Sequence, residues 1–203
     1  MHRAGEGQAP LVAGSKLPAG HENPVDALII LAIDRAVDLL HAVGVTPNAV
    51  TVMSALTSLL SLVYLVRRRP LPAAALWLAS YVLDCTDGLL ARRYGLETAF
   101  GDRLDHLTDT LAFLGLAAVV GLHVCRNRAL PRWPLAVEAL LLGLSYVHMS
   151  CQQRGSIARR YITIAGIAGD ACPSDTFVRT SRWAGMGTLL VWHLVLIGVY
   201  GRA

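Results

Sequence analysis

Five long apolar segments, separated by short polar ones, run through this chain of 203 residues. Each is close to the roughly 20 residues that an α-helix needs to cross the hydrocarbon core of a bilayer. The expected membrane-spanning helices cover residues 45–66, 71–91, 104–125, 133–151 and 183–200. The pattern therefore predicts an all-α fold, a polytopic bundle of membrane helices.

The ends of two of these segments carry recognisable signals. Thr46 can cap the first helix, and Pro47 suits its first turn because proline lacks the amide hydrogen that would be unpaired there. Trp183 and Tyr200 stand at the two ends of the last segment, where aromatic side chains anchor a helix at the membrane–water interface.

Three further segments lack the features of a spanning helix. Residues 24–43 mix apolar and acidic positions, which predicts an amphipathic juxtamembrane helix lying on the membrane. Residues 156–171 are mildly apolar but short, so the bundle has five or six spans. Residues 1–23 are polar and predict a disordered tail, which leaves residues 24–203 as a single membrane-embedded domain.

The composition agrees with a membrane protein. Apolar residues make up 54% of the chain and charged residues 16%, and the mean hydropathy is +0.49. A typical soluble domain has roughly 25% charged residues. The composition therefore excludes a disordered chain, a coiled coil and a disulfide scaffold, and it disfavours an ordinary soluble enzyme.

The distribution of charge indicates partners and orientation. The net charge is +4, and every basic residue except Lys16 is an arginine. The basic residues lie at the ends of apolar segments, which favours lipid head groups or phosphorylated substrates over nucleic acid. With five crossings, eleven basic residues fall on the side of the N-terminus and seven on the other side. The positive-inside rule then predicts a cytoplasmic N-terminus in a multi-pass protein of the cell membrane.

Acidic residues gather in the second and third spans. Six of the fourteen acidic residues lie between positions 84 and 109, and four of them belong to apolar helices: Asp84, Asp87, Asp105 and Asp109. An unpaired carboxylate at membrane depth costs at least about 2.5–3.5 kcal/mol, and carboxylates held close together also repel one another. Such a group persists only if a cation neutralises it.

Helical spacing predicts that these carboxylates converge. Asp84 and Asp87 share one helix face, and Asp105 and Asp109 form a stripe on the next helix. Ten residues, 92–101, connect the two stripes. Two antiparallel helices joined by a short loop can turn these faces toward each other at a membrane surface. All-oxygen ligation suits Mg²⁺ or Mn²⁺, which commonly share a site with substrate phosphates.

Neighbouring residues indicate room for a ligand beside the carboxylates. Gly88 and Ala91 continue the face of Asp84 and are small, and Arg92 at the helix end can hold a phosphate with two hydrogen bonds. A cation-coupled membrane transporter is the alternative from another class of function. Transport would not by itself require these three residues on that face.

Written out, the region reads Asp84-x2-Asp87-Gly88-x2-Ala91-Arg92-x8-Gly101-x3-Asp105-x3-Asp109. All eight fixed positions match the signature of the CDP-alcohol phosphatidyltransferase family, which the chain resembles over roughly residues 26–151. The resemblance implies a divalent-metal-dependent membrane enzyme of phospholipid biosynthesis, and it also implies a homodimer. Such enzymes transfer a phospho-alcohol group from a CDP-linked donor to an acceptor hydroxyl and release CMP.

The same resemblance implies roles for individual residues. The four aspartates would bind one or two Mg²⁺ or Mn²⁺ ions, and Asp109 would also act as general base on the acceptor hydroxyl. Contacts with the CDP part of the donor are implied for Gly88, Ala91, Arg92, Thr98 and Asn48. The site would open on the cytoplasmic face.

The acceptor remains open at this point. The preferred reaction joins CDP-diacylglycerol to a polar alcohol, and the alternative is transfer from CDP-ethanolamine or CDP-choline to diacylglycerol. The Asp105-His106 pair is similar to the second branch, although we interpret His106 as a helix contact. Arg154, Arg159 and Arg160 could bind a phosphorylated acceptor or lipid head groups.

Overall fold

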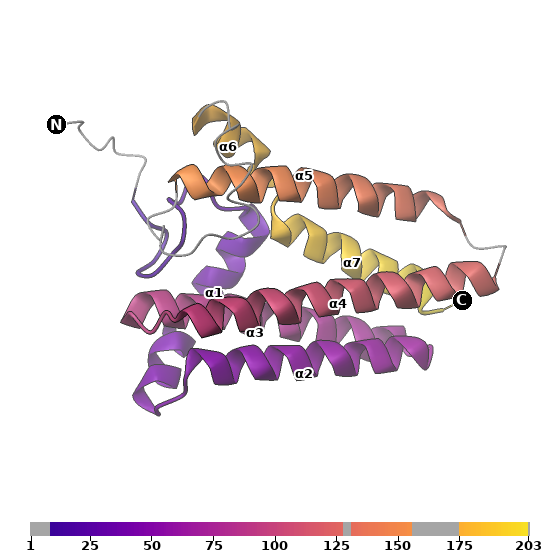
Figure 1. Cartoon of the computed structure of the whole chain (residues 1–203), viewed down its shortest axis with the longest axis horizontal. Coiled ribbons are helices and arrows are strands. Elements are labelled where there is room, and N and C mark those ends of the chain that lie inside the picture. The colour runs from indigo at the N-terminus through magenta and orange to yellow at the C-terminus, as the bar shows by residue number, and fades with distance from the viewer. Residues whose placement is uncertain (1–8, 128–130, 156–174, 203) are drawn as a thin grey trace.

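The computed structural model describes residues 9–127, 131–155 and 175–202 (Figure 1). The helical elements are α1 (Pro24–Ala42), α2 (Pro47–Val66), α3 (Pro70–Tyr94), α4 (Ala99–Arg126), α5 (Trp133–Gly155), α6 (Asp175–Ser181), the 3₁₀ turn η2 (Arg182–Ala184) and α7 (Met186–Tyr200). The described residues contain five helical stretches long and apolar enough to cross a membrane, and no strand. The expected all-α, multi-pass fold is confirmed.

A short loop joins α3 to α4, as expected for the ten residues 92–101 that connect the two stripes. Both helices extend past the expected spans, because α3 runs on to Tyr94 and α4 begins at Ala99. Gly95 ends α3 in a left-handed conformation with φ of 65°, which glycine adopts without strain. The Thr98 hydroxyl then caps α4 by accepting a hydrogen bond of 3.0 Å from the Gly101 amide. Arg92 and Gly101 are therefore both held on helices.

Helix α2 packs along both α3 and α4, while α3 and α4 have few close backbone approaches to each other. Thr46 caps α2 as expected, by accepting from the Ala49 amide at 3.3 Å. Ser61 donates a hydrogen bond of 2.7 Å to the Ala73 carbonyl, and Ser54 donates one of 2.8 Å to the Ser80 carbonyl. Small hydroxyl residues let membrane helices approach closely. Hydrogen bonds between the two helices therefore hold the α2–α3 contact.

Apolar residues lie both inside and outside the bundle. The core of the spanning helices includes Leu65, Trp77 and Ile197, which are at most 5% exposed. On the outside, Leu114 and Leu140 are each 62% exposed. A helix surface that contacts lipid has to carry apolar side chains, as the outside of these long helices does.

The last span differs from expectation at both ends. Gly185 has extended backbone, so α7 starts at Met186 and the expected start at residue 183 lies in η2. Trp183 is exposed, as an interfacial anchor should be. Tyr200 is fully buried and donates a hydrogen bond of 2.7 Å to the Pro131 carbonyl. The expectation that Tyr200 is an interfacial anchor is therefore wrong.

The juxtamembrane helix is present as α1, which crosses one end of the bundle at a steep angle to the long helices (Figure 1). Its buried face presents Ile30, Ile33 and Val37 to residues of α2 and α3. Leu28 and Leu39 are each 69% exposed on the other side. Contact of this apolar outer face with the membrane stays a prediction.

The segment before α1 is folded against the bundle. The expected disordered tail is wrong for residues 9–23, because Leu17 and Asn23 are each 1% exposed. Asn23 Nδ2 donates to the Arg182 carbonyl at 2.8 Å and contacts the Thr188 hydroxyl at 3.0 Å. These partners are far away in sequence, so local composition does not reveal them. Residues 1–8 and the possible sixth span at 156–171 lie outside the described residues.

Candidate active site

Carboxylates from α3 and α4 converge between the two helices. Carboxylate oxygens of Asp84, Asp105 and Asp109 lie within 4.8 Å of one another. The fourth expected ligand, Asp87, is not part of this group of three. It is 4% exposed, lies one helical turn further along α3 and shares a cavity lining with Asp105. The structure thus brings the two stripes together as their spacing predicts.

The carboxylate cluster fits a divalent cation. Asp87 Oδ2 and Asp105 Oδ1 are buried and have no hydrogen-bond partner among the described residues. Buried charged oxygens need donors or a cation to offset their lost hydration. Several carboxylate oxygens at this spacing are the donor set that Mg²⁺ and Mn²⁺ prefer. The four aspartates therefore supply the chemistry of a metal site.

An open cavity, here called the first cavity, lies beside Asp87 and Asp105 between α2, α3 and α4. All five residues for which the family resemblance implies contact with CDP line it: Asn48, Gly88, Ala91, Arg92 and Thr98. Gly101 also lines it. The residues selected from the sequence are thus brought together around one space.

The two glycines of the first cavity sit against polar side chains. A Cβ atom on Gly88 would lie 2.9 Å from Arg92 Nη1, and one on Gly101 would lie 2.7 Å from Asn48 Oδ1. Both distances are shorter than ordinary van der Waals contact. A larger residue at either position would push the guanidinium of Arg92 or the amide of Asn48 away from its present place.

A second cavity lies on the other side of the carboxylates. Asp84 and Asp109 line it, together with hydroxyl residues that include Ser54, Ser58 and Thr108. Since Asp105 lines the first cavity, the cluster of carboxylates stands between the two spaces. A group bound in one space and a group bound in the other can therefore meet at these carboxylates.

The structure adds residues that the sequence reasoning missed. Asp102 and Thr51 line the first cavity. Asp102 precedes Asp105 by three positions, so helical spacing could have placed it on this side of α4. His193 lines the second cavity, and its Nε2 lies 3.0 Å from Glu138 Oε1. No spacing rule links residues 138 and 193, which belong to separate helices.

Some expected residues lie elsewhere. His106 is exposed, and its Nδ1 lies 2.8 Å from the Asp102 carbonyl oxygen of the preceding turn, which agrees with a helix contact. Arg159 and Arg160 lie outside the described residues, as does the side chain of Arg154. Their proposed part in acceptor binding stays a prediction.

The whole membrane region matches one protein family. The family model for CDP-alcohol phosphatidyltransferase covers residues 44–199. The chain belongs to the CDP-alcohol phosphatidyltransferase family. This confirms the resemblance seen in the eight-position signature, and it decides against a transporter. The match begins at residue 44, so α1 and the segment before it lie outside the family region.

Curated members of this family include enzymes that use CDP-diacylglycerol. The chain is 36% identical over 89 residues to a CDP-diacylglycerol–serine O-phosphatidyltransferase of Mycobacterium leprae, covering 44% of this chain and 28% of that protein. It is 28% identical over 113 residues to a CDP-diacylglycerol–inositol 3-phosphatidyltransferase of Saccharomyces cerevisiae, covering 54% and 48%. The chain thus spans less than half the length of these relatives. No solved structure matches it.

Proposed function

We propose that this protein transfers the phosphatidyl group of CDP-diacylglycerol to the hydroxyl of a polar alcohol and releases CMP. The observation that carries the proposal is the convergence of the signature aspartates of α3 and α4 between two cavities. Membership of the family supports the reaction type. The names of the serine and inositol enzymes support CDP-diacylglycerol as donor over CDP-choline or CDP-ethanolamine.

The first cavity would receive the nucleotide part of the donor. Gly88 and Ala91 leave space there, and Arg92, whose guanidinium lies against Gly88, would pair with a phosphate of the donor. Asn48 and Thr98 line the same cavity and supply polar contacts from α2 and the start of α4. The donor would thereby be held with its phosphates toward the carboxylates.

The reaction would occur at the boundary of the two cavities. Asp109 lines the second cavity, where it would accept the proton of an acceptor hydroxyl. The acceptor oxygen would then attack the phosphorus of the phosphatidyl group, and the bond from that phosphorus to the oxygen of CMP would break. Divalent cations held by Asp84, Asp87, Asp105 and Asp109 would supply neutralisation of the phosphate charge.

The proposal includes a setting in the cell. The excess of arginine on one side supports an active site that faces the cytoplasm in the cell membrane. The homodimer that the family resemblance implies is also part of the proposal. Chemical cross-linking in native membranes tests the dimer, and labelling of single introduced cysteines tests the orientation.

An acceptor panel tests the proposed reaction. Purified protein would be supplied with labelled CDP-diacylglycerol, Mn²⁺ or Mg²⁺, and serine, inositol, glycerol phosphate or inositol phosphate in turn. We expect CMP release together with one labelled lipid product, and loss of both when a chelator removes the cation. Intact CDP-diacylglycerol with every acceptor would contradict the proposal.

Asp109→Asn tests the general base. The amide cannot accept the proton, so we expect turnover to fall by at least about a hundredfold. Binding of CDP should change little, because the first cavity is not lined by Asp109. Asp38→Asn is a matched control on the exposed side of α1 and should keep most of the turnover. Undiminished turnover in Asp109→Asn would remove this residue from the mechanism.

A further inference from the structure

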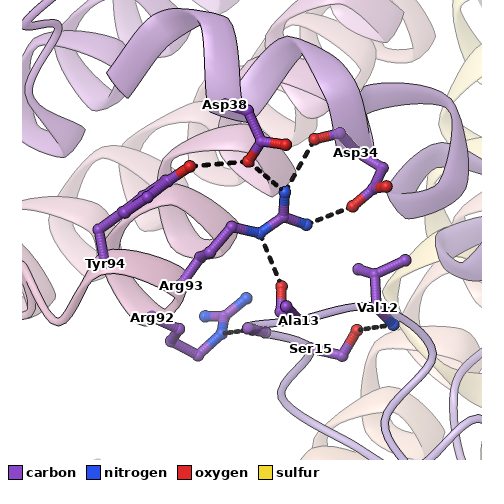
Figure 2. A network of polar contacts seen from close by, with 9 residues as sticks. Val12, Ala13, Ser15, Asp34, Asp38, Arg92, Arg93 and Tyr94 are labelled. Atoms are coloured by element: carbon purple, nitrogen blue, oxygen red, sulfur yellow. Dashed lines mark hydrogen bonds and ion pairs between the residues drawn. The ribbon is translucent and has the colours of Figure 1, made fainter. Parts of the chain in front are cut away.

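Residues 9–23, here called the N-terminal strap, are fastened to the end of α3 (Figure 2). Arg92 Nε donates a hydrogen bond of 2.9 Å to the Gly14 carbonyl, and Arg93 Nε donates one of 2.8 Å to the Ala13 carbonyl. Arg93 also pairs with Asp34 and Asp38 of α1. The strap thus contacts an arginine that lines the first cavity.

The strap has a defined conformation at this contact. Gly14 has φ of +85°, and a Cβ atom there would lie 2.8 Å from the Arg93 backbone nitrogen. Glycine is therefore required by both conformation and space. Three residues on, Leu17 is 1% exposed, and its amide donates to Glu22 Oε1 at 3.3 Å. Residue 16 therefore lies between two fixed residues, Gly14 and Leu17.

The other end of the strap is also tied down. Arg182 Nη1 donates a hydrogen bond of 3.1 Å to the Gly20 carbonyl, and Asn23 bonds to the Arg182 carbonyl. The strap is therefore connected to α3 at one end and to η2 at the other. Its position is set by the bundle rather than by its own sequence alone.

Lys16, the only lysine of the chain, lies between Gly14 and Leu17. It is exposed, and it interacts electrostatically with Arg92, Glu22, Asp105 and Asp102. Arg92, Asp102 and Asp105 line the first cavity. The ammonium group of Lys16 therefore lies in the electrostatic field of the cavity that the proposed function assigns to the nucleotide.

The two cations have unused donors. Among the described residues, no hydrogen bond or ion pair holds the Lys16 ammonium, and Arg92 uses only its Nε. Lys16 follows Gly14 by two residues, and the Gly14 carbonyl accepts the hydrogen bond from Arg92, so the strap brings the two cations near each other. An anion bound between two like charges stabilises both.

We propose that Lys16 and Arg92 form a clamp for a phosphate group of a substrate in the first cavity, with Lys16 presented by the N-terminal strap. The inference rests on the proposed function and adds to it a binding residue outside the family region, which begins at residue 44. Two sources supply the same chemistry: the diphosphate of the CDP-linked donor and the phosphate of a phosphorylated acceptor.

Calorimetry with the purified full-length protein in Mn²⁺ tests the clamp, with CDP as the probe in one arm and glycerol 3-phosphate in the other. Lys16→Met removes the charge and keeps the length of the side chain. We expect it to weaken binding of at least one probe about tenfold, the loss typical of a charge-assisted hydrogen bond. Lys16→Arg should restore binding to within about threefold. The arm that changes identifies the source of the phosphate.

Two further variants separate local from general effects. Arg35→Met removes one exposed positive charge from α1 and should leave binding unchanged. Gly14→Ala displaces the strap while keeping Lys16. It should weaken binding of the same probe whose binding Lys16→Met weakens. The melting temperature of each variant shows that it is folded.

The outcomes distinguish the clamp from the proposed function. If Lys16→Met binds both CDP and glycerol 3-phosphate as tightly as the wild-type protein does, the clamp is overturned and the proposed function is left intact. A loss in Arg35→Met as large as in Lys16→Met would also overturn it, because a general charge effect would then explain both. Failure of the wild-type protein to bind CDP would overturn the proposed function, and the clamp with it.

Discussion

At the scale of single residues, the surroundings of Glu22 in the strap change the pKa of its carboxyl group. It is 7% exposed, and burial followed by the nearby Asp26 carboxylate raises its pKa to about 7, against an ordinary value of 4.5. Asp38 shows the opposite change at an exposed position. Hydrogen bonds from Tyr94 and Arg93 lower the pKa of Asp38. The same residue class thus responds differently to burial and to cationic partners.

Glu22 makes the stability of the strap depend on pH. Because the folded protein keeps the Glu22 proton up to a pKa of about 7, the unfolded chain releases it first, and stability falls as pH rises from 4.5 to 7. We expect Glu22→Gln to remove this loss, worth up to about 3 kcal/mol. The measurement is the melting temperature of metal-free protein at pH 5 and pH 8, relative to wild type.

The variant should gain stability relative to wild type at pH 8 and little at pH 5. Asp38→Asn is the control. The Asp38 carboxylate is charged at both pH values and is stabilised in the folded state, so this variant should lose stability rather than gain it. Equal shifts of Glu22→Gln at pH 5 and pH 8 would contradict the assignment.

At the scale of elements, a polar contact inside the membrane region joins α5 to α7. His193 is 1% exposed and lies 3.0 Å from Glu138. Its ring also packs against Trp77 of α3 and Phe113 of α4, with ring centroids 5.5 and 5.3 Å away. One side chain therefore contacts three other helices.

Removing either partner of this contact should destabilise the bundle. His193→Ala leaves the Glu138 carboxylate buried without its partner, at a cost of about 2 kcal/mol. We expect the melting temperature to fall by about 5 °C. Leu140→Ala, on the exposed side of α5, is the control and should change it by less than about 1 °C. An unchanged melting temperature in His193→Ala would show that α5 docks on α7 without this contact.

At the scale of the whole molecule, the carboxylates of α3 and α4 couple the stability of the bundle to metal binding. Without a cation, the three close carboxylates repel one another across the space between the helices. A cation that binds the folded state alone stabilises it by about 2.7 kcal/mol at one hundred times its dissociation constant. The bundle should therefore be more stable in its metal-loaded form.

Saturating Mn²⁺ or Mg²⁺ should raise the melting temperature of the wild-type protein by roughly 5–10 °C. Asp84→Asn should lose most of this gain, since it removes one ligand of the group. The same variant should be no less stable than wild type in chelator, because one repelling charge is gone. An equal gain from the cation in both proteins would place the metal elsewhere.

Sequence reasoning succeeded where a property repeats along one helix. The apolar segments predicted all five spanning stretches, and the three- and four-residue spacings of Asp84, Asp87, Asp105 and Asp109 predicted the two faces that meet. It did not place the ends of α3 and α4, where Gly95 ends one helix and Thr98 caps the other. It also failed for Tyr200, because an aromatic residue at the end of a span can be an anchor or a core residue.

The sequence by itself determines the membrane helices and the chemistry of the two carboxylate stripes. Helical periodicity and the cost of charge in lipid both act over a few neighbouring residues. The tertiary structure alone decides that residues 9–23 fold onto α3, that Lys16 lies near Arg92, and that His193 meets Glu138. These contacts join residues more than fifty positions apart. Their formation depends on how whole helices pack, which local pattern does not specify.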